Sequence, residues 1–219
     1  MIPVLTLGDP RDLRLFQALR GLLAGKGPLL ALGSRQVWLP GGKTPFLLGD
    51  CGLVSQIWGN GLLAVKNCQL LPSSLYAQEG SLAVICSHHR ESVELLARTG
   101  IQAVTCGLSP RDTVTFSSLE PGRGTVALQR PLRLPAFSLR AEPGEFPAAF
   151  PPQWDAYTVL CCGAAAALLG LAEDGMALRE EEQREPQGWQ TSAQKLTVIF
   201  PGGSGILDNA NAKHELKFD

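Results

Sequence analysis

Residues 81–118 read SLAVICSHHRESVELLARTGIQAVTCGLSPRDTVTFSS, and this stretch decides the fold. LAVIC is a continuous apolar run of the length expected for a buried strand. RESVELLARTG follows with its apolar residues at helical spacing until Gly100 stops it, and IQAVTCG is a second apolar run. A strand, a helix and a strand joined this closely form a parallel, right-handed crossover. The sequence therefore predicts an α/β protein.

The segment after this crossover has a different pattern. TVTFSS, GTVALQR and AFSLR alternate polar and apolar residues, with PGRG as a turn between the first two, which predicts antiparallel strands. The run WDAYTVLCCGAAAALLGL at residues 154–171 predicts a buried helix whose alanines allow close packing on a neighbour. The expected fold is a mixed sheet with one parallel βαβ crossover, followed by antiparallel strands and an alanine-rich packing helix.

The N-terminal part shows weaker patterns. Asp9 is expected to cap a helix that begins at Pro10, because the leucines that follow form one apolar stripe, and Gly25 or Gly27 is expected to end it. Short apolar runs broken by glycine come next. They predict short strands and tight turns, with one helical turn at residues 53–58.

Length and composition limit the number of domains and the class of partner. A chain of 219 residues with 45% apolar residues can form a core without help from metals or disulfides. We expect one α/β domain at residues 1–200, with residues 1–71 as a candidate subdomain and an edge strand at residues 196–200. Residues 201–219 are expected to form a flexible tail that need not be native to the domain. The formal net charge of −1 argues against a nucleic-acid partner.

The N-terminus and the cysteines indicate an intracellular chain. MIPVLTLGDP lacks the basic start and the long apolar run of a secretory signal, and the apolar stretch at residues 159–171 is too short to span a membrane. The six cysteines have no spacing typical of a disulfide framework, so reduced thiols are expected. We expect a cytoplasmic protein with no membrane partner and no cofactor, for which a homo-oligomer is an allowed state.

Polar residues follow both strands of the crossover. Because parallel strands bind ligands at their carboxyl ends, the two loops after these strands form the candidate site. The helix that begins near His89 directs free N–H groups at the same space, which favours an anion such as a phosphate or a carboxylate. The predicted ligand-binding residues are Ser87, His88, His89 and Arg90 after the first strand, and Gly107, Ser109, Arg111 and Asp112 after the second.

The same segment allows a catalytic interpretation. Cys86 or Cys106, with His88 or His89, would supply the thiol and imidazole of a thiol-dependent enzyme. Thiolate and imidazole are also the usual zinc ligands, although the spacing of strong zinc motifs is missing. The structural alternative is that the cysteines are small core residues and the histidines form a polar start of the helix.

Motifs of common enzyme classes are missing from the sequence. GGKT at residues 41–44 matches only the end of a phosphate-binding loop, and Pro45 follows where a helix should begin. No GxGxxG, GxSxG or HExxH motif occurs. The favoured function is a non-catalytic module that binds a small anionic ligand or a partner protein. A structural or assembly role is the third interpretation, and an exposed apolar patch around Trp38, Phe46 and Trp58 would be its sign.

Part of the chain resembles the end of the central domain of the Mur ligases, the ATP-dependent amide-forming enzymes of peptidoglycan synthesis. The resemblance lies in TCGLS at residues 105–109, in DTV at residues 112–114 and in the alanine-rich run at residues 156–171. It covers roughly residues 82–171. The family's phosphate-binding loop is absent, and QWD at residues 153–155 stands where the family has a histidine-asparagine pair. The resemblance therefore implies the fold, and a shortened relative without ligase activity.

Overall fold

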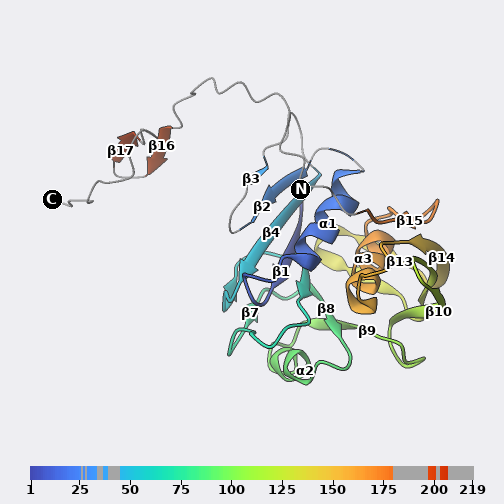
Figure 1. The fold of residues 1–219 in the computed structure, drawn as a ribbon. Helices are drawn as coiled ribbons and strands as arrows, with labels where there is room; N and C mark the ends of the chain where they lie inside the picture. Colours follow the sequence, from blue (N-terminus) through green and yellow to red (C-terminus); the bar gives the residue numbers. More distant parts are fainter. Residues whose placement is uncertain are drawn as a thin grey trace. The chain divides into compact units, whose positions relative to one another are not determined.

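The computed structural model describes part of the chain fully and part of it by its backbone alone (Figure 1). The fully described residues are 1–25, 27, 29–33 and 45–179, and the backbone is described at 37–38, 197–200 and 203–206. The chain divides into a compact unit at Met1–Glu181 and a second unit at Glu182–Asp219.

The second unit contains a two-stranded antiparallel hairpin, β16 (Thr197–Phe200) and β17 (Gly203–Ile206). The strand expected at residues 196–200 therefore exists, but the prediction that it edges the main sheet is wrong, because β16 pairs with β17. The flexible tail expected at residues 201–219 falls mostly outside the described residues.

An eleven-stranded sheet forms the first unit. Its strands are β1 (Ile2–Leu7), β2 (Leu29–Leu32), β3 (Val37–Trp38), β4 (Phe46–Gly52), β6 (Leu62–Val65), β8 (Leu82–Cys86), β9 (Gln102–Cys106), β10 (Val114–Glu120), β11 (Arg123–Leu128), β14 (Gly144–Ala149) and β15 (Met176–Ala177). Their order is β15-β14-β11-β10-β9-β8-β6-β1-β4-β2-β3. The expected mixed α/β fold is confirmed, and strands from residues 1–71 share this sheet with the later strands.

The middle of the sheet is parallel and its ends are partly antiparallel. The seven adjacent strands β10-β9-β8-β6-β1-β4-β2 are all parallel to one another. β11 is antiparallel to β10 and β14, and β3 is antiparallel to β2. The antiparallel pairing predicted after the crossover is thus confirmed, whereas the parallel part extends well beyond the one crossover that the sequence predicted.

Two layers cover the two faces of the sheet. Helices α1 (Arg14–Ala24) and α3 (Ala156–Leu168) pack on each other and on one face. Helix α2 (Arg90–Leu96) and the parallel pair β5 (Gln56–Ile57) and β7 (Tyr76–Ala77) pack on the other. A small hairpin of β12 (Leu132–Leu134), the 3-10 turn η1 (Pro135–Phe137) and β13 (Leu139–Ala141) joins β11 to β14. None of the described helices is long and apolar enough to cross a membrane.

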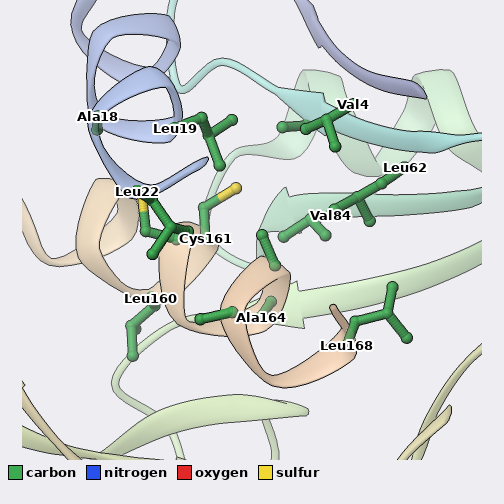
Figure 2. Close-up of a cluster of buried hydrophobic side chains, with 14 of the residues drawn as sticks. Val4, Ala18, Leu19, Leu22, Leu62, Val84, Leu160, Cys161, Ala164 and Leu168 are labelled. Carbon is green, nitrogen blue, oxygen red and sulfur yellow. The ribbon is translucent and has the colours of Figure 1, made fainter. Parts of the chain in front are cut away.

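Apolar side chains of α1, α3 and the strands form the larger core. Figure 2 shows Leu19 and Leu22 of α1 beside Cys161 of α3, with Val4 and Val84 on the strands next to them. The leucine stripe of α1 and the alanines of α3 therefore serve the packing roles that their spacing predicted.

Two N-terminal predictions need correction. Helix α1 begins at Arg14 and not at Pro10, because the Asp9 carboxylate accepts a hydrogen bond from the Arg11 N–H at 2.9 Å and so closes a turn before the helix. Gly25 ends the helix as expected. No helical turn exists at residues 53–58, since the backbone there pairs with β7 as strand β5.

The order of the strands reverses at β1. The chain passes from β1 through α1 to β2, and β4 then enters between them. From β4 the chain crosses to the other side of β1, where β6, β8 and β9 follow in order. Ligands of open parallel sheets bind at such a switch point, outside the carboxyl ends of the strands.

Candidate functional site

The two loops predicted from the sequence lie side by side at the carboxyl edge. Cys86 and Cys106 are partners in the register of β8 and β9, and the Ser87 N–H donates to the Cys106 carbonyl at 3.0 Å. Ser87 Oγ and Asp112 Oδ2 both lie so close to Gly107 that a Cβ there would overlap them. The structure therefore brings Ser87, Gly107 and Asp112 together. The Ser87 hydroxyl is buried without a hydrogen-bond partner among the described residues.

The other predicted residues differ in exposure. His88, Arg90 and Arg111 are exposed, and Arg90 forms an ion pair with Glu94 within α2. The ring of His89 is mostly buried, with Nδ1 against the Ser92 hydroxyl.

Ser109 shapes the turn after β9. Its N–H donates to the Asp112 carboxylate at 3.0 Å, and its hydroxyl accepts a hydrogen bond from the Arg111 N–H at 3.2 Å. Arg111 itself forms no ion pair with the described residues, so its guanidinium is available at the surface.

The cysteines of the two strands are core residues. Cys106 is 0% and Cys86 8% exposed, and both belong to the cluster beneath α3. Burial raises the pKa of the Cys106 thiol well above its ordinary value, and it raises the pKa of Cys161 to about 12. The burial of both thiols and the raised pKa of Cys106 favour the structural interpretation over a cysteine nucleophile. No group of three or more potential metal ligands occurs within the described ranges.

A buried ion pair, which the sequence did not indicate, occupies the switch point. Lys66 Nζ, just after β6, lies 2.8 Å from Oδ1 of Asp50 in β4, and it donates to the Asp9 carbonyl at 2.9 Å. The Thr6 hydroxyl of β1 also donates to Asp50, at 2.9 Å. The two side chains of the pair are 1% and 0% exposed. The ends of β1, β4 and β6 are thereby connected through one ammonium group.

A small polar cavity of about 90 Å³ lies beside Lys66, where α1 and α3 begin. It has room for about three water molecules. Its walls contain two basic and two acidic side chains, the amide of Asn67, and a tyrosine, a threonine and a leucine. These residues are Asp12, Arg14, Leu15, Lys66, Asn67, Asp155, Tyr157 and Thr158.

The carboxylates of this cavity already have partners. Asp12 accepts two hydrogen bonds from the Arg14 guanidinium, at 2.8 and 3.0 Å, which lower the pKa of Asp12. Asp155 caps α3 by accepting from the Thr158 N–H at 2.9 Å and from its hydroxyl at 2.7 Å. The donors are less fully used, because the Lys66 ammonium has three protons and two acceptors at hydrogen-bond distance. The cavity is therefore suited to a group that accepts hydrogen bonds.

A larger, open hollow of about 510 Å³ lies at the other end of α3, along β14. Four of its lining side chains are carboxylates, Glu142, Glu145, Glu173 and Asp174, and none is basic. Its charge disfavours an anion, so it is not the site that the sequence predicted.

Sequence reasoning missed the switch-point residues because their neighbours in space are distant in sequence. One signal was present in the sequence. Asp50 stands at the end of FLLGD and Lys66 at the end of LLAVK, and both are apolar runs of strand length. Opposite charges at the ends of two such runs are expected to pair if the strands are close. The strand order was needed to recognise the pair.

Comparison with known proteins gives a similarity in fold. No protein-family model matches the chain, and no curated protein matches it. Two crystal structures of MurF from Acinetobacter baumannii match with 11% and 10% identity, TM-scores of 0.46 and 0.45, and coverage of 78% and 97% of this chain. The UDP-N-acetylmuramoylalanyl-D-glutamyl-2,6-diaminopimelate--D-alanyl-D-alanyl ligase from the same organism matches with 12% identity, a TM-score of 0.47 and coverage of 97%. The chain spans about half the length of these structures, covering 43%, 51% and 51% of them.

Proposed function

We propose that this chain is a non-catalytic module that binds a small anionic ligand at the carboxyl edge of its parallel strands. The ligand would lie between the cavity beside Lys66 and the loops at residues 87–90 and 107–112. The observation behind the proposal is the charge arrangement of the cavity, in which the carboxylates are engaged and the Lys66 ammonium has three protons for two acceptors among the described residues.

We place one small molecule across the cavity and the two loops because a side chain of the cavity wall contacts the neighbouring strands β6 and β8. Tyr157, in the cavity wall, donates from its hydroxyl to the carbonyls of Val65 and Val84, which lie on the neighbouring strands β6 and β8. Neighbouring strands are about 5 Å apart. We propose that a ligand with two acceptor groups contacts the Asn67 amide through one of them and the loop at residues 87–90 through the other. To reach the Ser87 hydroxyl, which is buried, the ligand would have to displace part of that loop.

The loops add donors to those of the cavity. The Ser87 hydroxyl lacks a partner among the described residues. His88, next to it in sequence, and Arg111, in the turn after β9, are exposed. Asp112 would repel an anion, but its carboxylate is buried and turned to the Ser109 N–H. A dicarboxylate or a phosphorylated small molecule has the acceptors that this arrangement requires.

Binding without catalysis is favoured because Cys86 and Cys106, the thiols beside the two predicted loops, are buried, and burial raises the pKa of Cys106. A thiol nucleophile would have to be accessible and have a lowered pKa. Cys106 has the opposite properties.

The proposal is tested by titrating the ¹⁵N-labelled chain with inorganic phosphate and with a four-carbon dicarboxylate while amide shifts are recorded. We expect saturable shifts at Asn67, Ser87 and Gly107. Asn67→Ala and Ser87→Ala should each weaken binding at least fivefold. The matched control is Ser118→Ala, an exposed serine of β10 that bonds only to Thr125, and it should leave the affinity unchanged. Shifts spread over the whole surface, or affinity equal in all three variants, would disprove an anion site at this edge.

A further inference from the structure

The first half of β14 is an open edge of the sheet. On one side, β11 pairs with every residue of β14, whereas on the other side β15 pairs only with Ala148 and Ala149. β15 is the last strand of the sheet (Figure 1), so residues 144–147 have no neighbouring strand on their outer side within the described part of the chain. An uncovered edge of this kind is a template for pairing with another chain.

The backbone of Glu145 points to this open side. The Leu178 N–H donates to the Ala149 carbonyl at 2.8 Å, so the backbone groups of Ala149 point away from β11. In an antiparallel pair these groups alternate between the two sides of a strand, and Glu145 and Pro147 therefore point the same way as Ala149. Pro147 has no N–H, as is usual for a proline at a sheet edge. Glu145 has both an N–H and a carbonyl for a partner.

The hollow of about 510 Å³ lies along the same residues. Nothing lies within 4 Å of the Cβ position of Gly144, so the space beside the first residue of β14 is open. The apolar lining of the hollow comes from β11, from β14 and from the end of α3 and the residues after it. It consists of Leu128, Phe146, Pro147, Ala167 and Ala172. The open edge therefore borders a recess with an apolar wall.

The chain runs away from the hollow after β15. Leu178 is bonded to Ala149, at the opposite end of β14 from Gly144. The carbonyl oxygen of Arg179 then lies 3.7 Å from the Cβ position of Gly21 in α1. All the residues that line the hollow belong to the described part of the chain, and the segment that follows β15 leads from the hollow towards α1.

The charge of the hollow favours a cationic partner. Four of its lining side chains are carboxylates, and none of the described lining residues is basic. Glu142 forms an ion pair with Arg140, but Glu145, Glu173 and Asp174 are exposed and form no ion pair with the described residues. The carboxyl end of α3, which borders the hollow, adds partial negative charge.

We propose that this hollow binds an extended basic segment of a partner protein, which adds a strand to β14 at Glu145. Successive side chains of an extended segment point to opposite faces. Apolar side chains on one face would pack on Leu128 and Phe146, and lysines or arginines on the other would reach Glu173 and Asp174. Backbone hydrogen bonds to an open edge, with alternate side chains in pockets, are a common way of binding a peptide.

Charge also decides between this partner and a second copy of the chain. Two copies joined through this surface would bring identical acidic groups together, and like charges across an interface are unfavourable. The surface lies at the opposite end of α3 from the cavity beside Lys66, so the proposal does not depend on the anion site.

Fluorescence anisotropy of a short labelled peptide of alternating lysine and valine, titrated with the full chain, tests the charge requirement. We expect saturable binding that weakens as salt is added. Glu173→Lys combined with Asp174→Lys should weaken it by about tenfold or more. The matched control is Glu79→Lys, an exposed carboxylate outside the hollow, and it should leave the affinity unchanged. Equal affinity for a peptide of alternating glutamate and valine, or for spermine, would overturn the proposal.

N-methylated peptides test the added strand on the wild-type chain, so no variant has to fold. One peptide is methylated at its lysine amides and a second at its valine amides. Because alternate N–H groups of a strand point to opposite edges, only one of the two sets faces β14. One peptide should lose about tenfold or more in affinity, and the other should keep it. Equal affinities, or binding that leaves the amide signal of Glu145 unmoved, would overturn the proposal.

Discussion

Lys66 and Asp50 form an ion pair of 2.8 Å in which both side chains are withdrawn from solvent. The pair joins the ends of β4 and β6 on either side of β1, the Asp9 carbonyl accepts a hydrogen bond from Lys66, and the Thr6 hydroxyl donates to Asp50. Oδ2 of Asp50 is buried without a hydrogen-bond partner among the described residues. Removing two charges from water is costly, and the attraction between them compensates only where the geometry is good. Loss of one of the two charges is therefore expected to lower the stability of β1, β4 and β6 together.

Lys66→Met should destabilise the fold by about 3–5 kcal/mol, because it leaves the Asp50 carboxylate buried without a cation. Urea unfolding measures the change. The double variant with Asp50→Leu should recover most of the loss, since it removes the unpaired charge as well. The matched control is Arg123→Gln, whose ion pair with Glu120 is exposed, and it should change stability by less than about 0.5 kcal/mol. A double variant as unstable as the single one would contradict this explanation.

Tyr157→Phe should cost about 1–3 kcal/mol, because the buried hydroxyl donates to the carbonyls of Val65 and Val84. The same unfolding experiment measures it. Tyr76→Phe is the matched control, because the Tyr76 side chain is largely exposed and its hydroxyl reaches solvent. Equal effects of the two substitutions would show that the bridge between β6 and β8 contributes little.

Gly107→Ala should destabilise the chain by about 1–3 kcal/mol and weaken anion binding, because the added methyl group overlaps Ser87 Oγ and Asp112 Oδ2. Gly144→Ala is the control at the amino end of β14. Nothing lies within 4 Å of its Cβ position, so it should be neutral or slightly stabilising. Unfolding midpoints and the phosphate titration together report both effects. A Gly107→Ala chain with the midpoint and affinity of the wild type would show that the turn adapts freely.

The buried thiols make stability fall at high pH. Burial raises the pKa of Cys161 from its ordinary 9.0 to about 12 and that of Cys106 in the same direction. The unfolded chain therefore releases these protons at lower pH than the folded chain. Their contribution is fully present below pH 9 and is lost as the pH rises from 9 towards 12. The free energy of unfolding should decline over this range, and Cys161→Ala should reduce the slope.

Thiol labelling checks the same point in a second way. At pH 8, a water-soluble alkylating reagent should modify the half-buried Cys51 and Cys68 in the folded chain. Cys106, Cys161 and Cys162 should react only after unfolding, because they are inaccessible and neutral. Rapid labelling of Cys106 in the folded chain would contradict this prediction and would support the interpretation of the chain as a thiol-dependent enzyme.

The elements that sequence alone predicted are those with a strong local pattern. β8, α2 and β9 follow from continuous apolar runs and helical spacing, and α3 follows from a long apolar segment. The cap that Asp155 forms on α3 was not predicted. β1 was missed, although Ile2–Leu7 is one of the central strands, because Pro3 interrupts its pattern and its partners are at residues 46–52 and 62–65. No local signal specifies such pairing.

The sequence could name only part of the residues that the structure gathers at the carboxyl edge of the sheet. The ends of β8 and β9 could be named because they are close in sequence, and the structure places Ser87 beside Gly107. The cavity at Lys66 depends on side chains from both ends of the chain, Arg14 and Tyr157 among them. An exposed patch around Trp38, Phe46 and Trp58 would have been the sign of a structural role. Trp58 is exposed, Phe46 is buried beneath α1, and the side chain of Trp38 lies outside the described residues.

The place of β4 between β1 and β2 imposes an order on folding. β1 and β2 form no hydrogen bonds to each other in the sheet, because each pairs with one edge of β4, which follows both in the sequence. A nascent chain that ends before residue 46 therefore contains β1 without either of its sheet partners, and β2 with only the short strand β3 beside it. β10 and β11 close over a short turn and need nothing distant. We expect refolding to begin in the β10–β11 hairpin and to end when β4 inserts between β1 and β2. Formation of the N-terminal half of the sheet is therefore expected to be the slow step.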